Sequence, residues 1–220
     1  MVDGILAVVS HPDDETFGCG GTLSLHSKLG ENVDVLCLTC NPPEREHEII
    51  DAFNILTSNK PIVFPDLHIG SNNSTIRKIS DIIIEKRPTA VITHVPFDYH
   101  REHRATYDAV KEAVEWAAHT TLYEYPCKVE RLLLMEVNTL IPSPHVLVDF
   151  SDVADRKWAA MDRYTSQLNK FDWEYYQRFN RKKAELRGVQ GNVKYAEAFL
   201  EEPLQKNGPF YESKVTRSLL

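Results

Sequence analysis

The sequence contains no tract of basic residues, and acidic side chains outnumber basic ones. Asp and Glu total 32 against 25 Lys and Arg, which gives a formal net charge of −7. Proteins that bind nucleic acid or an anionic membrane surface usually present clustered positive charge. The composition therefore makes nucleic acid and anionic membranes poor candidates for partners of this chain.

Long apolar runs are lacking as well. No segment approaches the roughly 20 consecutive apolar residues that span a bilayer, so we expect no membrane span. The first residues lead directly into a short apolar stretch, without the basic region and the small-residue cleavage site of a secretory signal. On these grounds we expect a cytoplasmic protein.

Cysteine is sparse, with four residues in the chain. Cys37 and Cys40 have the C-x-x-C spacing, but no second cysteine pair is present to complete a structural zinc site. An Asn-Pro-Pro sequence follows them, whereas a thioredoxin-like motif would open a helix. We therefore interpret the pair as two cysteines at the end of a buried strand. A chain of 220 residues buries roughly 70% of its unfolded surface and needs no disulfides to fold.

The first half of the chain alternates short apolar runs with amphipathic segments. The apolar runs predict strands over residues 5–9, 33–39, 61–64 and 90–93. The amphipathic segments predict helices over residues 22–29, after a turn at Gly20-Gly21, and over 44–56, 74–86 and 104–118. This alternation predicts an α/β fold with a Rossmann-like, mostly parallel sheet and helices on both of its faces.

The C-terminal part is less regular. Strands are expected over residues 122–125, 131–135 and 146–148, and helices over 153–168 and 173–187. No linker rich in glycine, serine or proline separates this part from the first half, and no internal repeat is visible. We therefore expect one domain over residues 1–220.

Chemistry-bearing side chains follow two of the predicted strands. The first strand is followed by His11, Asp13, Asp14 and Glu15, and the fourth by a segment with His94, Asp98, His100, Glu102 and His103. Because ligands of open parallel sheets bind beyond the carboxyl ends of the strands, both clusters are expected at one edge of the sheet. Two histidines and a carboxylate are a common ligand set for a catalytic divalent metal, and a cation would offset the repulsion among adjacent carboxylates.

Each of these signals has an ordinary alternative. Adjacent acids also occur at solvated helix starts, and an H-x-x-H spacing is often formed by surface or capping residues. The glycines of "FGCGG" do not have the G-x-G-x-x-G spacing of a dinucleotide loop. His94 follows the fourth strand and is interpreted as structural. The joint occurrence of the clusters at one edge favours a metal site.

Several longer motifs run over nearly the whole chain: "HPDDE" followed by "GCGGTL", then "REHEIIDAFNIL", "HREHRA", "VDFSDVADRKWAAMDRYTSQ" and "YAEAF". Together these motifs resemble those of the LmbE-like (PIG-L-type) zinc de-N-acetylases. The sequence departs from the family pattern at Glu102 (usually Asp), Arg101 (commonly Pro), Tyr164 (usually His) and Thr57 (usually Gly). None of these changes removes a residue that the pattern assigns to the metal.

The resemblance implies a role for each matching residue. His11, Asp14 and His103 would bind one zinc ion per chain, with Fe2+ or Co2+ as alternatives for the same ligands. Asp13 would act as the general base on the metal's water, and His100 would polarise the acyl oxygen. Arg45 would lie at the edge where the substrate binds, and Asp66, after the third strand, could contact sugar hydroxyls or form a turn.

The activity implied by the resemblance is hydrolysis of the acetamide of an N-acetylglucosamine-type amino sugar or glycoconjugate. A deacylase of a non-sugar N-acyl compound and a metal-free α/β module that binds a sugar or a nucleotide are the alternatives. The expected partner is thus a small amino-sugar substrate, while formation of a homo-oligomer stays open. The sequence also leaves open the roles of Glu15, Glu102, His94 and Tyr164.

Overall fold

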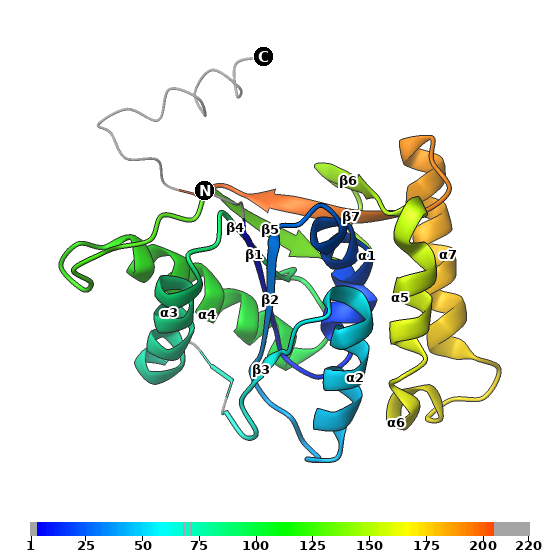
Figure 1. The fold of residues 1–220 in the computed structure, drawn as a ribbon, viewed down its shortest axis with the longest axis horizontal. Helices are drawn as coiled ribbons and strands as arrows, with labels where there is room; N and C mark the ends of the chain where they lie inside the picture. Colours follow the sequence, from blue (N-terminus) through cyan, green and yellow to red (C-terminus); the bar gives the residue numbers. More distant parts are fainter. Residues whose placement is uncertain (1–3, 68, 71, 205–220) are drawn as a thin grey trace.

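A mixed sheet forms the centre of the computed structural model, which describes residues 4–67, 69, 70 and 72–204. Its strand order is β3-β2-β1-β4-β5-β7-β6 (Figure 1). The strands are β1 (Gly4–Val9), β2 (Asn32–Cys37), β3 (Ile62–Val63), β4 (Ala90–His94), β5 (Arg131–Met135), β6 (Val146–Asp149) and β7 (Ala196–Glu202). The five strands from β3 to β5 are parallel, and β7 is antiparallel to both of its neighbours. The predicted α/β fold with a mostly parallel sheet is confirmed.

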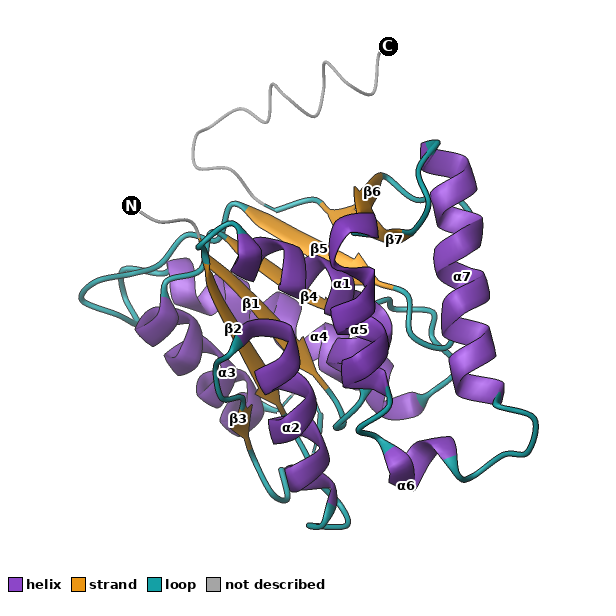
Figure 2. Cartoon of the chain, turned by 45° about the vertical axis from the view of Figure 1, so that its right-hand side comes forward, coloured by secondary structure: helices purple, strands orange, loops and turns teal. Residues whose placement is uncertain are grey.

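Helices cover both faces of this sheet, as predicted. Helices α3 (Asn73–Lys86) and α4 (Arg101–Ala118) pack together on one face, and α1 (Asp14–Lys28), α2 (Arg45–Thr57) and α5 (Ala154–Met161) pack on the other. The short η1 (Ser151–Val153) precedes α5, and α6 (Thr165–Leu168) leads to α7 (Tyr175–Gly191), which lies beside α5 (Figure 2). Side chains of β1 alternate between two buried apolar clusters, one under each helical layer. Within the described part of the chain, no helix combines the length and the apolar character needed to cross a membrane.

Helix α1 begins earlier than expected, and the predicted turn at Gly20-Gly21 is wrong. The helix starts at Asp14 and contains the glycines, with a kink at Cys19, where φ is −140°. The glycines are needed for close packing: a Cβ on Gly18 would lie 2.4 Å from the sulfur of Met135, and one on Gly21 would lie 2.3 Å from the ring of Phe150. The "FGCGG" stretch therefore lets the helix approach its neighbours closely.

The kink in α1 is held by side chains from the C-terminal part. In a regular helix the N–H of Gly21 would bond to the carbonyl of Phe17. Here the Gly21 N–H donates to Glu197 Oε1 at 2.8 Å, and the Phe17 carbonyl accepts from the ammonium groups of Lys157 at 3.3 Å and Lys183 at 3.2 Å. Lys157 also pairs with Glu197 at 2.5 Å, and both side chains are buried. Strand β7 and helices α5 and α7 therefore fix the helix that follows the first strand.

The C-terminal part differs from the prediction in three places. The expected strand over 122–125 is a turn segment, in which Leu122 and Tyr125 are exposed. The expected helix over 153–168 is broken between α5 and α6 at Tyr164, whose ψ of 54° is not helical. Strand β7 was not predicted, because its place in the sheet depends on pairing with two strands that are distant in sequence. The remaining strands and helices lie close to their expected positions.

Candidate active site

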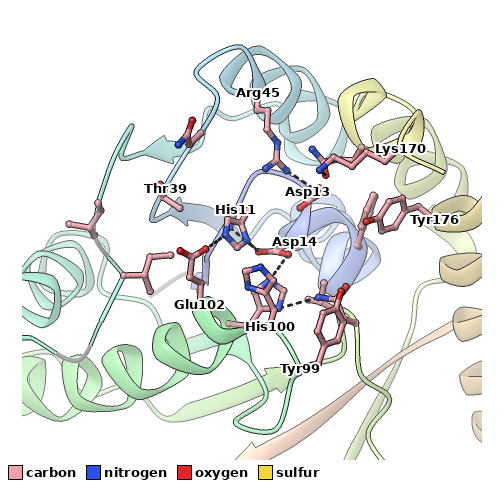
Figure 3. A pocket seen from close by; sticks show the side chains of 18 of the residues that line it. His11, Asp13, Asp14, Thr39, Arg45, Tyr99, His100, Glu102, Lys170 and Tyr176 are labelled. Atoms are coloured by element: carbon pink, nitrogen blue, oxygen red, sulfur yellow. Dashed lines mark hydrogen bonds and ion pairs between the residues drawn. The ribbon is translucent and has the colours of Figure 1, made fainter.

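All seven predicted site residues line one cavity of about 650 Å³. They are His11, Asp13, Asp14, Arg45, Asp66, His100 and His103. The cavity lies beyond the carboxyl ends of β1 and β4, where the strand order reverses direction along the sheet. This is the place where open parallel sheets bind their ligands. Figure 3 shows the side chains that converge there from the loops after the strands and from the first turns of α1, α2, α4 and α7.

Asp14 is the buried centre of the histidine cluster. One of its carboxylate oxygens lies 3.4 Å from His11 Nδ1 and 3.5 Å from His94 Nε2, and the other lies 3.3 Å from His103 Nε2. Burial alone would raise the pKa of Asp14, but His103, His94 and His11 together hold this pKa well below its usual value. Asp14 is therefore poised as an anionic oxygen ligand.

Two further carboxylates orient the histidines. Glu102 lies 2.6 Å from His11 Nε2, and Asp98 lies 3.4 Å from His103 Nδ1. Each contact engages one ring nitrogen and leaves the other facing Asp14, which is the arrangement that usually fixes metal-binding imidazoles. Burial lowers the pKa of His103, but the Asp14 and Asp98 carboxylates outweigh it and raise this pKa to about 10. Although Glu102 is longer than the usual Asp, it still reaches a histidine of the cluster.

His94 has the environment of a structural histidine. It is fully buried at the end of β4, and its ring stacks on that of His103 at a centroid distance of 4.0 Å. Burial lowers the pKa of His94 to about 3, so the ring is neutral. Its Nε2 accepts the Ser10 N–H at 3.1 Å, which occupies the lone pair that a metal would need at this nitrogen. These contacts favour the structural interpretation of His94.

The donor set fits a divalent metal. In the part of the chain that the structure describes, two groups of three side chains are close enough to share an ion: His11, His100 and His103, and Asp14, His94 and His103. The set expected from the sequence, His11, Asp14 and His103, draws on both groups. Imidazole nitrogens with one carboxylate oxygen are typical ligands of catalytic zinc. Among the described residues, the buried His100 Nδ1 has no hydrogen-bond partner, which also fits a site that receives a ligand.

Asp13 has an unusual backbone conformation. Its φ is 115°, a region that L-residues rarely adopt and that costs about 1–3 kcal/mol unless the surroundings enforce it. Arg45 Nη2 lies 3.2 Å from Asp13 Oδ2 and also donates to the Pro12 carbonyl. Burial, followed by the charge of Asp14, raises the pKa of Asp13 well above its usual value, against the opposing effect of Arg45. Such conformations cluster at functional sites, so the strain itself marks Asp13 as a functional candidate.

Glu15 is the third acid of the motif, and it points away from the cavity into a buried hydrogen-bond cluster. Its Oε2 accepts the backbone N–H of Asp13 at 3.2 Å. Its Oε1 accepts the hydroxyl of Thr16 at 2.5 Å and the hydroxyl of Tyr164. Glu15, Thr16 and Tyr164 are all fully buried. Glu15 is thus a structural partner of the motif and does not line the cavity.

The cavity is lined by both aromatic and polar side chains. The aromatic residues are Phe17, Tyr99 and Tyr176, and Figure 3 shows Tyr99 and Tyr176 on the same side of the cavity, away from Thr39. Thr39, Asn41 and Asp66 also line the cavity, and Thr39 forms an isolated β-bridge with Asp66. Sequence reasoning missed Tyr176, Asn138 and Lys170. They belong to the less regular C-terminal part, where no spacing pattern indicated which residues face the strand ends.

Comparison with known proteins places these features in a family. Residues 6–114 match the family model described as PIG-L: GlcNAc-PI de-N-acetylase. A probable N-acetyl-alpha-D-glucosaminyl L-malate deacetylase 2 of Bacillus cereus is 26% identical over 190 residues, which cover 74% of this chain and 83% of that protein. An uncharacterized deacetylase of Escherichia coli, YaiS, is 29% identical over 137 residues, covering 56% of this chain and 74% of that protein.

Solved structures share the whole fold. The conserved protein TT1542 of Thermus thermophilus has a TM-score of 0.83 and 28% identity, covering 96% of this chain and 99% of that one. The N,N'-diacetylchitobiose deacetylase of Pyrococcus horikoshii has a TM-score of 0.80 and 21% identity, with 96% and 88% covered. GalB of Pseudomonas putida, a 4-carboxy-2-hydroxymuconate hydratase, has a TM-score of 0.79 and 20% identity, with 95% and 100% covered.

A deacetylase and a hydratase share this fold, so the fold alone does not decide the reaction. The assignment rests instead on the family model, which spans most of the first strand, the "HPDDE" motif and the "HREHRA" segment, together with relatives that match through most of their length. On these grounds the chain belongs to the PIG-L (LmbE-like) family.

Proposed function

We propose that this protein is a metal-dependent hydrolase that removes the acetyl group from an N-acetylglucosamine-type amino sugar or glycoconjugate. The observation that carries the proposal is the cluster of His11, Asp14 and His103 at the base of a cavity, with the Asp13 carboxylate beside it. The family and the relatives named as deacetylases support N-deacetylation as the class of reaction.

In this proposal, His11, Asp14 and His103 hold one divalent metal ion. Zinc is the expected ion, and Fe2+ or Co2+ suits the same ligands. When bound, the metal supplies a Lewis acid that lowers the pKa of water toward about 7 and polarises the acyl oxygen. Glu102 and Asp98 keep the two imidazole rings turned so that one nitrogen of each faces the ion.

Asp13 is the proposed general base, which takes a proton from the water that attacks the amide carbon. Its carboxylate lines the cavity and is steadied by Arg45. His100 also lines the cavity, and its ring contacts that of His11 at a centroid distance of 5.0 Å. A hydrogen bond from His100 to the developing oxyanion would contribute roughly 3–4 kcal/mol to transition-state stability. Asp13 or His100 then returns a proton to the leaving amine, which atom balance in amide hydrolysis requires.

The walls of the cavity support a sugar as substrate. Tyr99 and Tyr176 offer aromatic faces to the apolar side of a pyranose ring, while Asp66 and Asn41 offer acceptors and donors to its hydroxyls. Arg45, predicted to bind substrate, is 7% exposed and bonds to Pro12 and Asp13, so we assign it chiefly to holding the base.

An acetate-release screen tests the proposed function. The substrates are N-acetylglucosamine, its glycosides and N-acetyl amino acids, each assayed with and without a chelator. We expect release from amino-sugar compounds, loss of release with the chelator and recovery when zinc is restored. Release from the amino acids alone would favour the non-sugar alternative, and no release from any amide would refute deacetylation.

A further inference from the structure

We propose that Tyr164 and Glu15 act as positioning residues that hold the backbone, and thereby the carboxylate, of Asp13. The chain of contacts runs from the break between α5 and α6 to the end of β1. Tyr164 donates to Glu15, and Glu15 accepts from the N–H of Asp13. The kinetic test of this inference rests on the proposed function, whereas the test of the backbone contact does not.

The backbone at Asp13 needs external support. Its φ of 115° is a conformation that relaxes unless the neighbouring groups enforce it. Three hydrogen bonds surround the residue: the Asp13 N–H donates to Glu15 Oε2 at 3.2 Å, the Asp13 carbonyl accepts the Phe17 N–H at 2.9 Å, and the Pro12 carbonyl accepts from Arg45. Glu15 supplies the side-chain acceptor of this set, so its rotamer bears on the direction of the Asp13 carboxylate.

The rotamer of Glu15 is fixed by donors on its other oxygen. Oε1 accepts the hydroxyls of Thr16 and Tyr164, and all three side chains are fully buried. A buried carboxylate that loses a donor turns toward another one, since an unsatisfied buried oxygen is unfavourable. Loss of the Tyr164 hydroxyl therefore weakens the bond from Glu15 to the Asp13 N–H.

Tyr164 is also one of the four positions at which the sequence departs from the family pattern, which usually has His there. Both residues place a ring with a hydrogen-bond donor at this point of the chain. The Tyr164 ring packs edge-on against Phe17, a residue of the cavity wall, at a centroid distance of 5.9 Å. The Tyr164 hydroxyl is thus the donor that this chain supplies to the buried acid of the motif.

The test compares Tyr164→Phe with a matched control, Tyr123→Phe. Tyr123 also donates its hydroxyl to a carboxylate, Asp81 at 2.6 Å, but that pair is exposed and its residues do not line the cavity. For Tyr164→Phe we expect kcat for acetate release to fall about ten- to hundredfold, because a misplaced catalytic group reacts slowly. KM and zinc content stay within about twofold of the wild type, since the variant leaves the metal ligands and the cavity wall in place. Tyr164→His recovers most of kcat, and Tyr123→Phe retains it.

Amide hydrogen exchange at Asp13, measured by NMR on the same proteins, gives a readout that does not depend on turnover. We expect exchange to be about tenfold faster or more in Tyr164→Phe and unchanged in Tyr123→Phe, because the Asp13 N–H is held by Glu15. If Tyr164→Phe does not fold, the nearly isosteric Thr16→Val, which removes the other donor to Glu15 Oε1, provides the same comparison.

Unchanged exchange at Asp13 in the folded variant would overturn the inference, whether or not kcat falls. Faster exchange with an unchanged kcat would also overturn it, because Asp13 would then not need the support. A lower melting temperature alone would identify Tyr164 as a packing residue. A wild type that releases no acetate would refute the proposed function instead, and the exchange measurement would still decide whether Tyr164 and Glu15 hold Asp13.

Discussion

Replacement of Asp13 by Asn separates the proposed base from the proposed metal ligands. The substitution removes a negative charge while keeping nearly the same shape, and Asn is among the residues that best tolerate positive φ, so the backbone at φ 115° is preserved. Arg45 loses its ionic partner at 3.2 Å but keeps its bond to the Pro12 carbonyl. The loss of this ion pair destabilises the folded protein, whereas relief of the repulsion between Asp13 and Asp14 stabilises it. We therefore expect a folded variant that retains its metal.

In Asp13→Asn we expect kcat to fall while the bound metal is retained. Removal of a general base lowers kcat by roughly 100- to 10,000-fold, which corresponds to about 3–5 kcal/mol of transition-state stabilisation. The assay is acetate release under saturating substrate, combined with elemental analysis of zinc in the same sample. Asp66→Asn is the matched control, because it removes the same charge from another residue that lines the cavity. That variant is expected to raise KM with little change in kcat.

Two results would refute the role assigned to Asp13. If Asp13→Asn contains zinc and keeps kcat within about tenfold of the wild type, a different group takes the proton from water. If the variant loses its zinc, Asp13 contributes to metal binding and the ligand set must be revised.

Two further substitutions test the support of the site. Glu102→Ala removes the carboxylate that lies 2.6 Å from His11 Nε2. We expect the zinc affinity, measured by competition with a chromogenic chelator, to fall about 10- to 100-fold. An unchanged affinity would mean that Glu102 does not orient the His11 ring. Glu197→Ala leaves Lys157 buried without its ionic partner and exposes the break in α1, so urea unfolding should show a loss of about 3–5 kcal/mol. A loss below about 1 kcal/mol would show that the pair between Glu197 and Lys157 does not hold the kinked helix.

Local patterns were sufficient to predict the first half of the fold. The strands from β1 to β4 and the helices from α2 to α4 have apolar periodicities that do not depend on distant residues. The start of α1 was not predictable in this way. The glycines there resemble a turn signal, and only the closeness of Met135 and Phe150 explains their place inside a helix. Strand β7 likewise exists through pairing with β5 and β6.

The candidate site likewise contains residues that local sequence patterns indicated and residues that they did not. The rule for parallel sheets and the "HPDDE" motif were enough to select residues that line one cavity, although their roles remain proposals. The contact between Tyr164 and Glu15 joins residues that are 149 positions apart, and no spacing indicates it. Tyr176 and Lys170 reach the cavity from the segment around α6 and α7, whose course is set by tertiary packing. Sequence thus indicated the acids and histidines, while the structure was needed to find what orients them.

A zinc titration of the metal-stripped protein, followed by acetate release from an N-acetylglucosamine glycoside, tests the proposed metal-dependent deacetylation most directly. We predict no turnover before zinc is added, a rise in proportion to the zinc bound, and saturation at about one ion per chain, as one ligand set implies. The same titration of His103→Ala should give neither tight binding nor turnover, since that ring lies 3.3 Å from Asp14 in the proposed ligand set. Full turnover in the stripped protein, or equal zinc binding and turnover in His103→Ala, would contradict the proposal.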